Sequence, residues 1–391
     1  MTHDVILTAA DEYMCHQSVA SFEQVTTTDR NWTEKGYIVA YDTTGEVLVA
    51  MGIGKYTNRD VMDAFAGIAV PGRQWNVRAA RELRPELDRT TVGPVAWEVV
   101  QPPVRNRIIL ADNDLDVSFD VTFESDFEPI VGSPGLRRDR GITGNHTIRY
   151  FQPGRAAGEV RVEGRTYTLD PARSYAYKDR SWGIRTMTGI PHPGAFWFSD
   201  PAGVPEAGLR PVPDHGQGVL HGYLNFNFGT WALSSTFTQG PDGKPMTSST
   251  GSTEGFVVFA DNKEPRLRIT QLDLDFEFWP ESRRAKSLVA HASLEDGTSR
   301  EIVCQWKDLV YYFRGGGYFG FRGWWQGGYR GELDVAGEAL DLRDKSARDE
   351  LYGCEEIAID CVCGDEKGHG VMEPWAIGAL PRYGITEEML G

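Results

Sequence analysis

The residues best suited to chemistry in this 391-residue sequence lie between positions 174 and 185, which read SYAYKDRSWGIR. In a β-strand, side chains alternate between two faces. One face would then carry Tyr177 and Asp179, and the other would carry Arg180 and Trp182. We expect one face to line a cavity and the other to face a second domain. The alternative interpretation is a structural ion-paired bulge at the rim of a barrel.

A second carboxyl group, Glu373, has a different sequence environment from Asp179. Met372, Pro374 and Trp375 surround Glu373 with apolar groups, whereas Asp179 lies between two basic residues. An apolar environment raises the pKa of a carboxyl group, and a neighbouring cation lowers it. Two acids whose pKa values diverge in this way can act as proton donor and base. We therefore predict that Glu373 is the proton donor and that Asp179 is the base or a structural anion.

His146 is the third candidate for proton transfer, because histidine titrates near neutral pH. It precedes a strand-like segment at 148–150, and a solvent-facing position at a strand end is the alternative. We expect Arg180 and Arg185 to hold the acid or a substrate oxygen, and Trp182 to form a wall of the cavity. The predicted substrate-binding residues are Arg180, Trp182, Arg185, Tyr177, Gln152 and Trp375.

The elements that position these residues read as β-strands. Residues 115–123 and 272–278 alternate apolar and polar side chains, and this period of two indicates half-buried antiparallel strands. Residues 36–41 and 46–51 flank a DTTG turn and predict a hairpin. Few segments could form a long helix, and 341–351 is the best candidate, so the sequence predicts an all-β, mainly antiparallel fold.

The sequence also contains two similar stretches, at 150–164 and 324–337. Both have two aromatic residues, a glutamine, and then a Gly-Glu pair. After that pair, Val or Leu, then Val, then Gly stand at every second position. A repeat with a period of this size indicates a duplicated domain rather than a solenoid. We therefore expect two β domains, at 1–188 and 189–391, with a boundary near 183–193 where Gly and Pro accumulate.

Composition and charge exclude several classes of function. A net charge of −16 opposes binding to nucleic acid and to anionic membranes. No apolar run approaches the roughly 20 residues that span a bilayer, and the first residues do not resemble a signal peptide. We expect a cytoplasmic protein without membrane insertion. Five cysteines are few for this length, which favours reduced thiols.

Two motifs that suggest a cofactor or a metal are better explained by structure. Residues 315–320 match G-x-G-x-x-G, but strand-like residues follow where a dinucleotide site needs a helix. Cys354, Cys361, Cys363 and His369 lack the paired C-x-x-C spacing of a structural zinc site. We therefore expect neither a cofactor nor a metal.

The segment Lys178–Arg185 resembles the D-x-S-W-G-x-R signature of the carotenoid 1,2-hydratase (hydroxyneurosporene synthase)-like superfamily. The hairpin at 151–160 and the late Gly-x-Gly-x-x-Glu ending at Glu373 are similar to that group as well. This resemblance implies two tandem lipocalin-like β-barrel or sandwich domains and no redox cofactor or metal. Its members include hydratases of isoprenoid double bonds and proteins that assist cyclisations. Arg180 stands where histidine is often expected, so a histidine-based role is not transferred.

Together, these observations predict a cofactor-independent lyase or isomerase of the hydratase, dehydratase or cyclase type. Its substrate would be a small hydrophobic organic molecule such as a terpenoid, steroid, polyketide or phenolic. Positioned carboxyl groups would move protons in an aromatic-lined cavity. One alternative is a non-catalytic lipocalin-like carrier or sensor, and another is a structural protein in which the charged motif closes the fold. The sequence leaves the substrate and the oligomeric state open.

Overall fold

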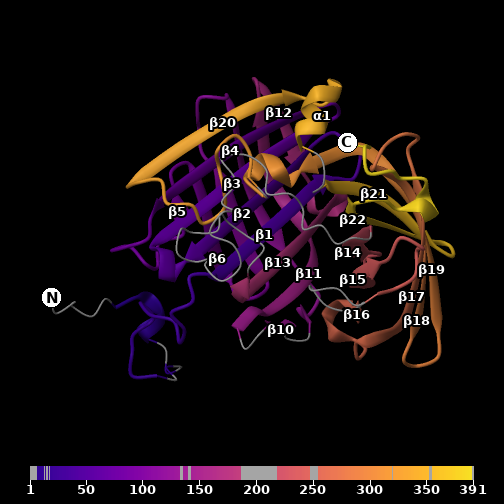
Figure 1. Cartoon of the computed structure of the whole chain (residues 1–391), viewed down its shortest axis with the longest axis horizontal. Coiled ribbons are helices and arrows are strands. Elements are labelled where there is room, and N and C mark those ends of the chain that lie inside the picture. Colours follow the sequence, from indigo (N-terminus) through magenta and orange to yellow (C-terminus); the bar gives the residue numbers. More distant parts are fainter. Residues whose placement is uncertain are drawn as a thin grey trace.

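A computed structural model of the chain contains two antiparallel β-units that lie side by side (Figure 1). The structure describes residues 7–389 without 13, 15, 17, 133–134, 140–141, 186–217, 247–253, 319 and 352–354. The strands are β1 (Trp32–Asp42), β2 (Leu48–Tyr56), β3 (Val61–Val70), β4 (Arg73–Glu82), β5 (Thr91–Val92), β6 (Val95–Gln101), β7 (Arg105–Leu110), β8 (Val117–Glu124), β9 (Ile130–Val131), β10 (Gly135–Asp139), β11 (Ile142–Val162), β12 (Arg165–Leu169), β13 (Ser174–Arg185), β14 (Val219–Asn227), β15 (Trp231–Gln239), β16 (Glu254–Phe259), β17 (Leu267–Phe278), β18 (Ala285–Leu294), β19 (Ser299–Tyr312), β20 (Leu333–Asp341), β21 (Glu355–Cys363) and β22 (Glu366–Ile377).

Helical structure is sparse in the described residues. The α-helix α1 spans Lys345–Leu351, the C-terminal part of the segment that the sequence predicts as a helix. The remaining helical elements are short 3-10 turns: η1 (Ala9–Glu12), η2 (Thr57–Arg59), η3 (Pro171–Arg173), η4 (Ala260–Asn262), η5 (Phe313–Gly316) and η6 (Pro381–Tyr383). No described helix is long and apolar enough to cross a membrane.

The first unit is one large sheet, which we call the first sheet. Eleven of its strands follow the order β20-β4-β3-β2-β1-β13-β11-β8-β7-β6-β5, and β9, β10 and β12 also pair with β11. The second unit, which we call the barrel, closes in the order β14-β15-β16-β17-β18-β19-β21-β22. The predicted all-β, mainly antiparallel fold class is confirmed.

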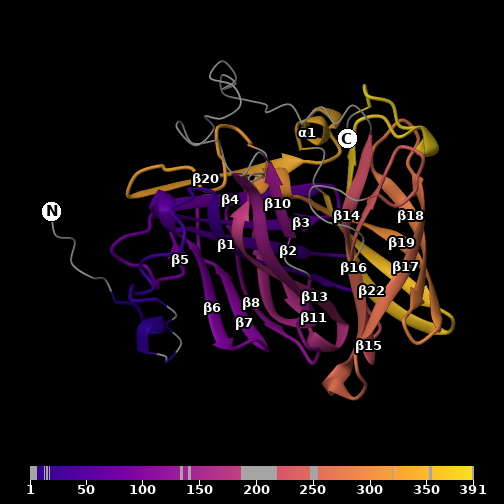
Figure 2. The ribbon, with the colours of Figure 1, turned by 60° about the horizontal axis from the view of Figure 1, so that its bottom comes forward.

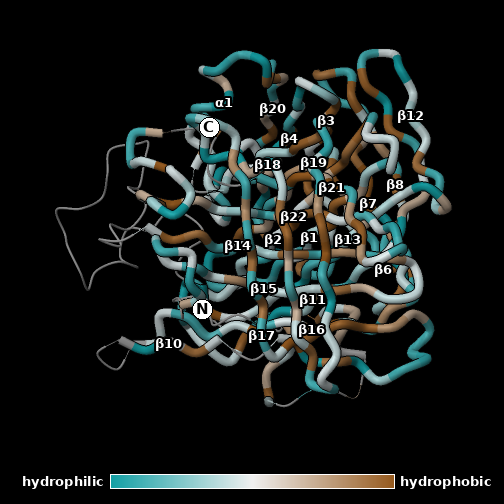
Figure 3. The backbone as a smooth tube through the Cα atoms, turned by 90° about the vertical axis from the view of Figure 1, so that its right-hand side faces the viewer, coloured by the Kyte–Doolittle hydropathy of each residue, from teal (hydrophilic) through white to brown (hydrophobic). Residues whose placement is uncertain are grey.

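The alternation of apolar and polar residues explains which face of each strand is buried. In β8 the side chains of Val117, Phe119, Val121 and Phe123 are buried, and the residues between them are more exposed. β17 shows the same period of two. The predicted hairpin forms from β1 and β2, with Gly45 at a φ of 83° in the turn. Hydrophobic segments therefore gather in the strands, while many of the peripheral turns are hydrophilic (Figure 3).

Buried apolar residues form three clusters. One fills the inside of the barrel with residues such as Leu224, Phe237 and Leu288. A second packs within the first unit around Ile38, Trp97 and Val121. The third joins the two units, and we call this contact the interface. Its members include Tyr37, Phe65, Phe151 and Tyr177 of the first sheet, and Tyr223, Tyr311, Ala358 and Val371 of the barrel.

One strand from the C-terminal half of the chain belongs to the first sheet. β20 pairs antiparallel with β4, and it runs beside β4 in both views (Figures 1 and 2). The two similar sequence stretches thus occupy different places, because residues 150–162 lie in β11 and the later copy ends in β20. The alignment of these stretches does not mark equivalent parts of two units. The domain bounds 1–188 and 189–391 stay a prediction, and most of the expected boundary lies outside the described residues.

Candidate active site

Three carboxyl groups from both units meet at the interface. Asp179 lies on β13 opposite Tyr37 of β1. Glu373 lies on β22 opposite Tyr223 of β14. Glu356 lies on the neighbouring barrel strand β21, opposite Tyr311 of β19. The outer face of the barrel and one face of the first sheet therefore supply the acids, and tyrosines stand beside each of them.

Burial raises the pKa of both barrel acids. Burial, followed by the charge of Asp179, raises the pKa of Glu373 to about 8. Burial and the neighbouring Glu373 raise the pKa of Glu356 well above its usual value. The Glu356 and Glu373 side chains are hydrogen-bonded, and Tyr37 Oη lies 3.1 Å from Glu356 Oε2. Since two carboxylates without a proton cannot hydrogen-bond to each other, at least one of this pair is protonated.

Asp179 is held by a cation from its own sheet. Arg149 Nε lies 3.4 Å from Asp179 Oδ1, and the two side chains keep 21% and 17% of their surface exposed. Burial would lower the pKa of Arg149, but Asp179 and the nearby tyrosines raise it on balance. The Arg149 guanidinium also lies 4.9 Å from the ring centre of Tyr223 of the barrel. The sequence predicts a basic partner for Asp179, but that partner comes from β11 rather than from the adjacent residues.

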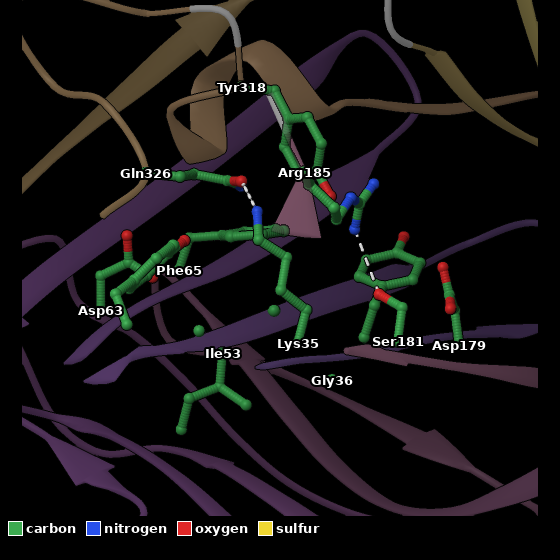
Figure 4. A pocket seen from close by; sticks show the side chains of 14 residues that line it. Lys35, Gly36, Ile53, Asp63, Phe65, Asp179, Ser181, Arg185, Tyr318 and Gln326 are labelled. Atoms are coloured by element: carbon green, nitrogen blue, oxygen red, sulfur yellow. Dashed lines mark hydrogen bonds between the residues drawn. The ribbon is translucent and has the colours of Figure 1, made fainter. Parts of the chain in front are cut away.

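A narrow pocket opens beside Asp179 on the face of the first sheet that meets the barrel (Figure 4). Lys35 donates a hydrogen bond to Gln326, and Arg185 Nη1 donates one to Ser181 Oγ over 3.1 Å. The space between the side chains has room for little more than a water molecule. Its walls include Lys35, Tyr37, Asp63, Asp179, Arg185 and Tyr318.

Several predicted site residues join this arrangement. Tyr177 is fully buried on the same face as Asp179, and its ring lies 6.2 Å from that of Tyr37. Trp375 lies on the outer face of the barrel, with its ring 6.4 Å from that of Tyr223. Arg185 lines the pocket. The structure therefore brings Asp179, Glu373, Tyr177, Trp375 and Arg185 to the interface.

Other predicted site residues lie on the opposite face of β13 and β11, as the predicted alternation requires. On that face Lys178, which is not among the predicted site residues, contacts Pro103 O and Asn106 Oδ1 within the first unit. Arg180 Nη1 donates a hydrogen bond to Lys35 O over 3.1 Å, and Trp182 pairs with Ile148 of β11. Gln152 donates a hydrogen bond to Phe127 O over 2.9 Å.

This placement corrects the expectation for the two faces of residues 174–185. The face with Asp179 both lines the pocket and meets the barrel, while the other face turns into the first unit. The pocket is lined by the first sheet and by Tyr318 and Gln326, which follow β19 in the chain, whereas a hydrophobic core fills the inside of the barrel.

Two histidines differ in position. His146 is exposed on β11, opposite Ile184, and among the described residues it forms no hydrogen bond or ion pair with the carboxyl groups of Asp179, Glu356 and Glu373. His221 of β14 is buried, and its Nδ1 lies 2.9 Å from Thr238 Oγ1. Burial and the charge of Arg149 lower the pKa of His221 to about 4. His221 is therefore neutral at pH 7 near the site, and the sequence reasoning did not select it.

Sequence reasoning also missed Glu356, Arg149, Lys35 and Asp63. Glu356 precedes the apolar run of β21, which is a detectable signal because an acid at the start of a buried strand needs a partner. Lys35 and Asp63 are likewise charged residues near the start of the largely apolar strands β1 and β3. Only the pairing of strands distant in sequence reveals that these groups converge.

The cysteines and histidine considered for a metal have other surroundings. Cys361 faces the core of the barrel, and His369 Nδ1 lies 2.9 Å from Asp360 Oδ1. Cys354 lies outside the described residues. Within the described ranges, no group of three or more His, Cys, Asp or Glu residues could hold a metal ion.

Comparison with known proteins identifies the sequence family of this chain. No curated protein sequence matches the chain. A solved structure of a candidate AttH from Nitrosomonas europaea is 12% identical, with 88% of this chain and 92% of that chain covered and a TM-score of 0.48. Kievitone hydratase from Nectria haematococca is 12% identical, with 88% of both chains covered and a TM-score of 0.38. With TM-scores this low, neither similarity indicates a shared function. The sequence matches the family of unknown function DUF8625 over residues 7–386, and the chain belongs to that family.

Proposed function

We propose that the chain is an enzyme that adds water to, or removes it from, a carbon–carbon double bond of a small, largely apolar molecule. The observation that carries this proposal is the electrostatic coupling at one interface between Glu373, an acid with a raised pKa, and Asp179, an acid paired with arginine. Hydration needs both a proton donor and a base, and two carboxyl groups in different environments supply them. The resemblance of residues 178–185 to carotenoid 1,2-hydratases points to the same chemistry.

Each acid has one role in the hydration direction. Glu373 donates its proton to one alkene carbon, and a water molecule attacks the other carbon while Asp179 accepts a proton from that water. A proton then returns from Asp179 to Glu373, so the enzyme is restored and one water has been added. Dehydration runs through the same steps in reverse. General acid and base assistance of this kind contributes about 10²–10⁴-fold to the rate.

The aromatic residues around the acids suit a substrate that develops positive charge. The rings of Tyr37, Tyr177 and Phe151 lie near one another on the first sheet. Such rings attract a cation by about 0.5–2 kcal/mol each. The buried hydroxyl of Tyr177 has no hydrogen-bond partner among the described residues, and a substrate oxygen could accept its proton.

Substrate binding requires the interface to open. The pocket as it stands holds little more than a water molecule, and Tyr318 is among the side chains that close it. A movement of Tyr318 would extend the pocket between the two units. Ring packing of Tyr318 against Phe313 and Phe65 is what such a movement must break.

The test is incubation of the protein with isoprenoid alkenes, tertiary alcohols and prenylated phenols in ¹⁸O-labelled water. Mass spectrometry of the products detects the addition of labelled water. Asp179→Asn and Glu373→Gln should each lower the rate on a converted compound by about 10²-fold or more. Glu355→Gln is the matched control, because Glu355 is a buried acid next to Glu356 that pairs with Tyr312 instead of Tyr311.

The outcomes separate the proposed enzyme from a carrier. Full turnover by both interface variants would refute the assignment of the acids. Binding of a panel compound without any labelled product would favour a carrier instead. The filled interior of the barrel already removes the usual ligand position of a lipocalin-like carrier from the second unit.

A further inference from the structure

Lys35 is a second reactive group in the pocket, and the proton transfers described above do not use it. It lies on β1 opposite Ser181, two residues along β13 from Asp179 and on the same face. Only 8% of its surface is exposed, and its side chain lines the pocket (Figure 4). Diagonal neighbours on adjacent strands are about 7–8 Å apart. A small substrate can therefore touch Lys35 and Asp179 together.

The amine of Lys35 is hydrogen-bonded to a neutral side chain and lies near two aromatic rings. Its Nζ donates a hydrogen bond to the side chain of Gln326 and lies 5.2 Å from the ring centre of Tyr318 and 5.8 Å from that of Tyr56. It forms no ion pair with any carboxylate of the described residues within 4.0 Å. A buried lysine usually has such a partner, because an isolated buried charge is costly.

The surrounding charges favour a neutral amine. Burial and the positive charge of Arg185 lower the pKa of Lys35 well below its usual value, with Arg59 and Arg149 acting in the same direction. Asp63 opposes this shift, but burial raises the pKa of Asp63 itself to about 6. A lysine that is desolvated beside another cation is the kind that forms covalent bonds with carbonyl compounds.

We propose that Lys35 forms an imine with an aldehyde or ketone that is conjugated to the double bond undergoing hydration. The substrate class is thus an α,β-unsaturated carbonyl compound, and this part of the proposal rests on the proposed hydration. The lone pair of Lys35 Nζ attacks the carbonyl carbon, and the nitrogen transfers a proton to the oxygen to give a carbinolamine. The carbinolamine oxygen then takes up a proton from solvent, the carbon–oxygen bond breaks, the oxygen leaves as water, and a protonated carbon–nitrogen double bond remains.

A protonated imine makes the conjugated double bond more reactive towards water. Its positive nitrogen withdraws electrons, so that water adds to the β-carbon while Asp179 accepts a proton from that water. Glu373 then protonates the α-carbon, and a second water hydrolyses the imine to release the hydrated carbonyl compound, the free amine and the proton that was taken up from solvent. A proton returns from Asp179 to Glu373, so both acids are restored. The position of Lys35 beside Asp179 on adjacent strands suits this sequence of steps.

The test is reductive trapping with citral, an α,β-unsaturated isoprenoid aldehyde, and sodium cyanoborohydride at pH 7, followed by digestion and mass spectrometry. An exposed lysine is neutral in only about one molecule in two thousand at pH 7. We expect Lys35 to be modified at least about tenfold more than exposed Lys244 in the same digest. Buried Lys178, which lies on the other face of β13, should stay unmodified.

Two variants keep this test decisive. Lys35→Arg and Lys35→Met should both lose the trapped adduct while keeping the cooperative thermal unfolding of the parent protein. Modification that follows exposure, with Lys244 ahead of Lys35, would overturn the proposal. Labelled-water addition to a double bond without any adduct at Lys35 would overturn the imine and leave the hydration intact. An adduct at Lys35 together with full activity of Glu373→Gln would support the imine and refute the acid assignment.

Discussion

Asp179 and Glu373 come from different β-units, yet the charge of Asp179 contributes to raising the pKa of Glu373 to about 8. Neither unit alone contains both groups, because Asp179 lies in the first sheet and Glu373 in the barrel. The acid–base pair thus depends on the packing of the two units. A change that loosens the interface should impair the chemistry even if each unit stays folded.

Removal of the charge at Asp179 should lower the pKa of Glu373. In Asp179→Asn, burial still raises this pKa, but the anion is gone and Arg149 is left without its partner. Both effects favour the ionised form of Glu373. The measurement is ¹³C NMR titration of the protein labelled at its glutamate carboxyl carbons. The pKa of Glu355, which is about 7 because of burial, should stay unchanged as an internal control.

Activity should fall as the pH rises through about 8. Glu373 donates a proton in the proposed hydration, and only its protonated form can do so. The rate should thus decline tenfold per unit above that pH. A pH–rate profile on a converted substrate measures this limb. A rate that continues to rise above pH 9 would contradict the role of Glu373.

Stability should decrease between mildly acidic and mildly alkaline pH. Burial raises the folded-state pKa of Glu373 to about 8 and that of Glu355 to about 7. Between the unfolded value and these folded values, the folded state binds more protons than the unfolded state. Each such group then lowers the free energy of unfolding by about 1.4 kcal/mol per pH unit. Urea denaturation at pH 5, 7 and 9 measures the trend.

Glu355→Gln should make this pH dependence less steep. The variant removes one buried acid without a large change in volume, so the folded protein no longer binds the extra proton. Its stability relative to the parent should rise between about pH 5 and 7 and then level off. An unchanged slope over that range would show that Glu355 is not protonated in the folded state.

The sequence predicts local structure better than the partners of each residue. The alternation in residues 174–185 places Asp179 and Lys178 on opposite faces, and the apolar neighbours of Glu373 agree with its raised pKa. The ion pair of Asp179 with Arg149 was missed because it depends on the register between β13 and β11. Period-two alternation identifies a face but names no partner strand.

Sequence patterns also fail to show which whole strands pair with each other. Residues 324–337 resemble residues 150–164, but this similarity does not reveal that residues 333–341 form a strand at the edge of the first sheet. Their actual partner, β4, lies about 260 residues earlier in the chain. Likewise, the hydrogen bond between Glu356 and Glu373 depends on the pairing of β21 with β22, which brings two like-charged residue types together.

Gly67 leaves room for a barrel side chain at the interface, because glycine has no Cβ atom. A Cβ atom at this position would lie 2.0 Å from Tyr311 Cε2 of the barrel. Gly67→Ala should therefore destabilise the protein by about 1–3 kcal/mol through overpacking. Chemical denaturation measures the loss. The double variant with Tyr311→Ala should show a smaller penalty for the added methyl group, and an equal penalty would point to a backbone effect instead.

Tyr41 connects the first sheet to two strands of the barrel. Its Oη lies 2.9 Å from Ile359 O and 2.8 Å from Gly370 O, and it accepts a hydrogen bond from Gly370 N over 3.0 Å. Tyr41→Phe removes these contacts at a fully buried site, so the free energy of unfolding should fall by about 1–3 kcal/mol. Tyr312→Phe is the matched control, since the buried Tyr312 hydroxyl has no hydrogen-bond partner among the described residues. Equal stability losses in the two variants would mean that the Tyr41 hydrogen bonds do not hold the units together.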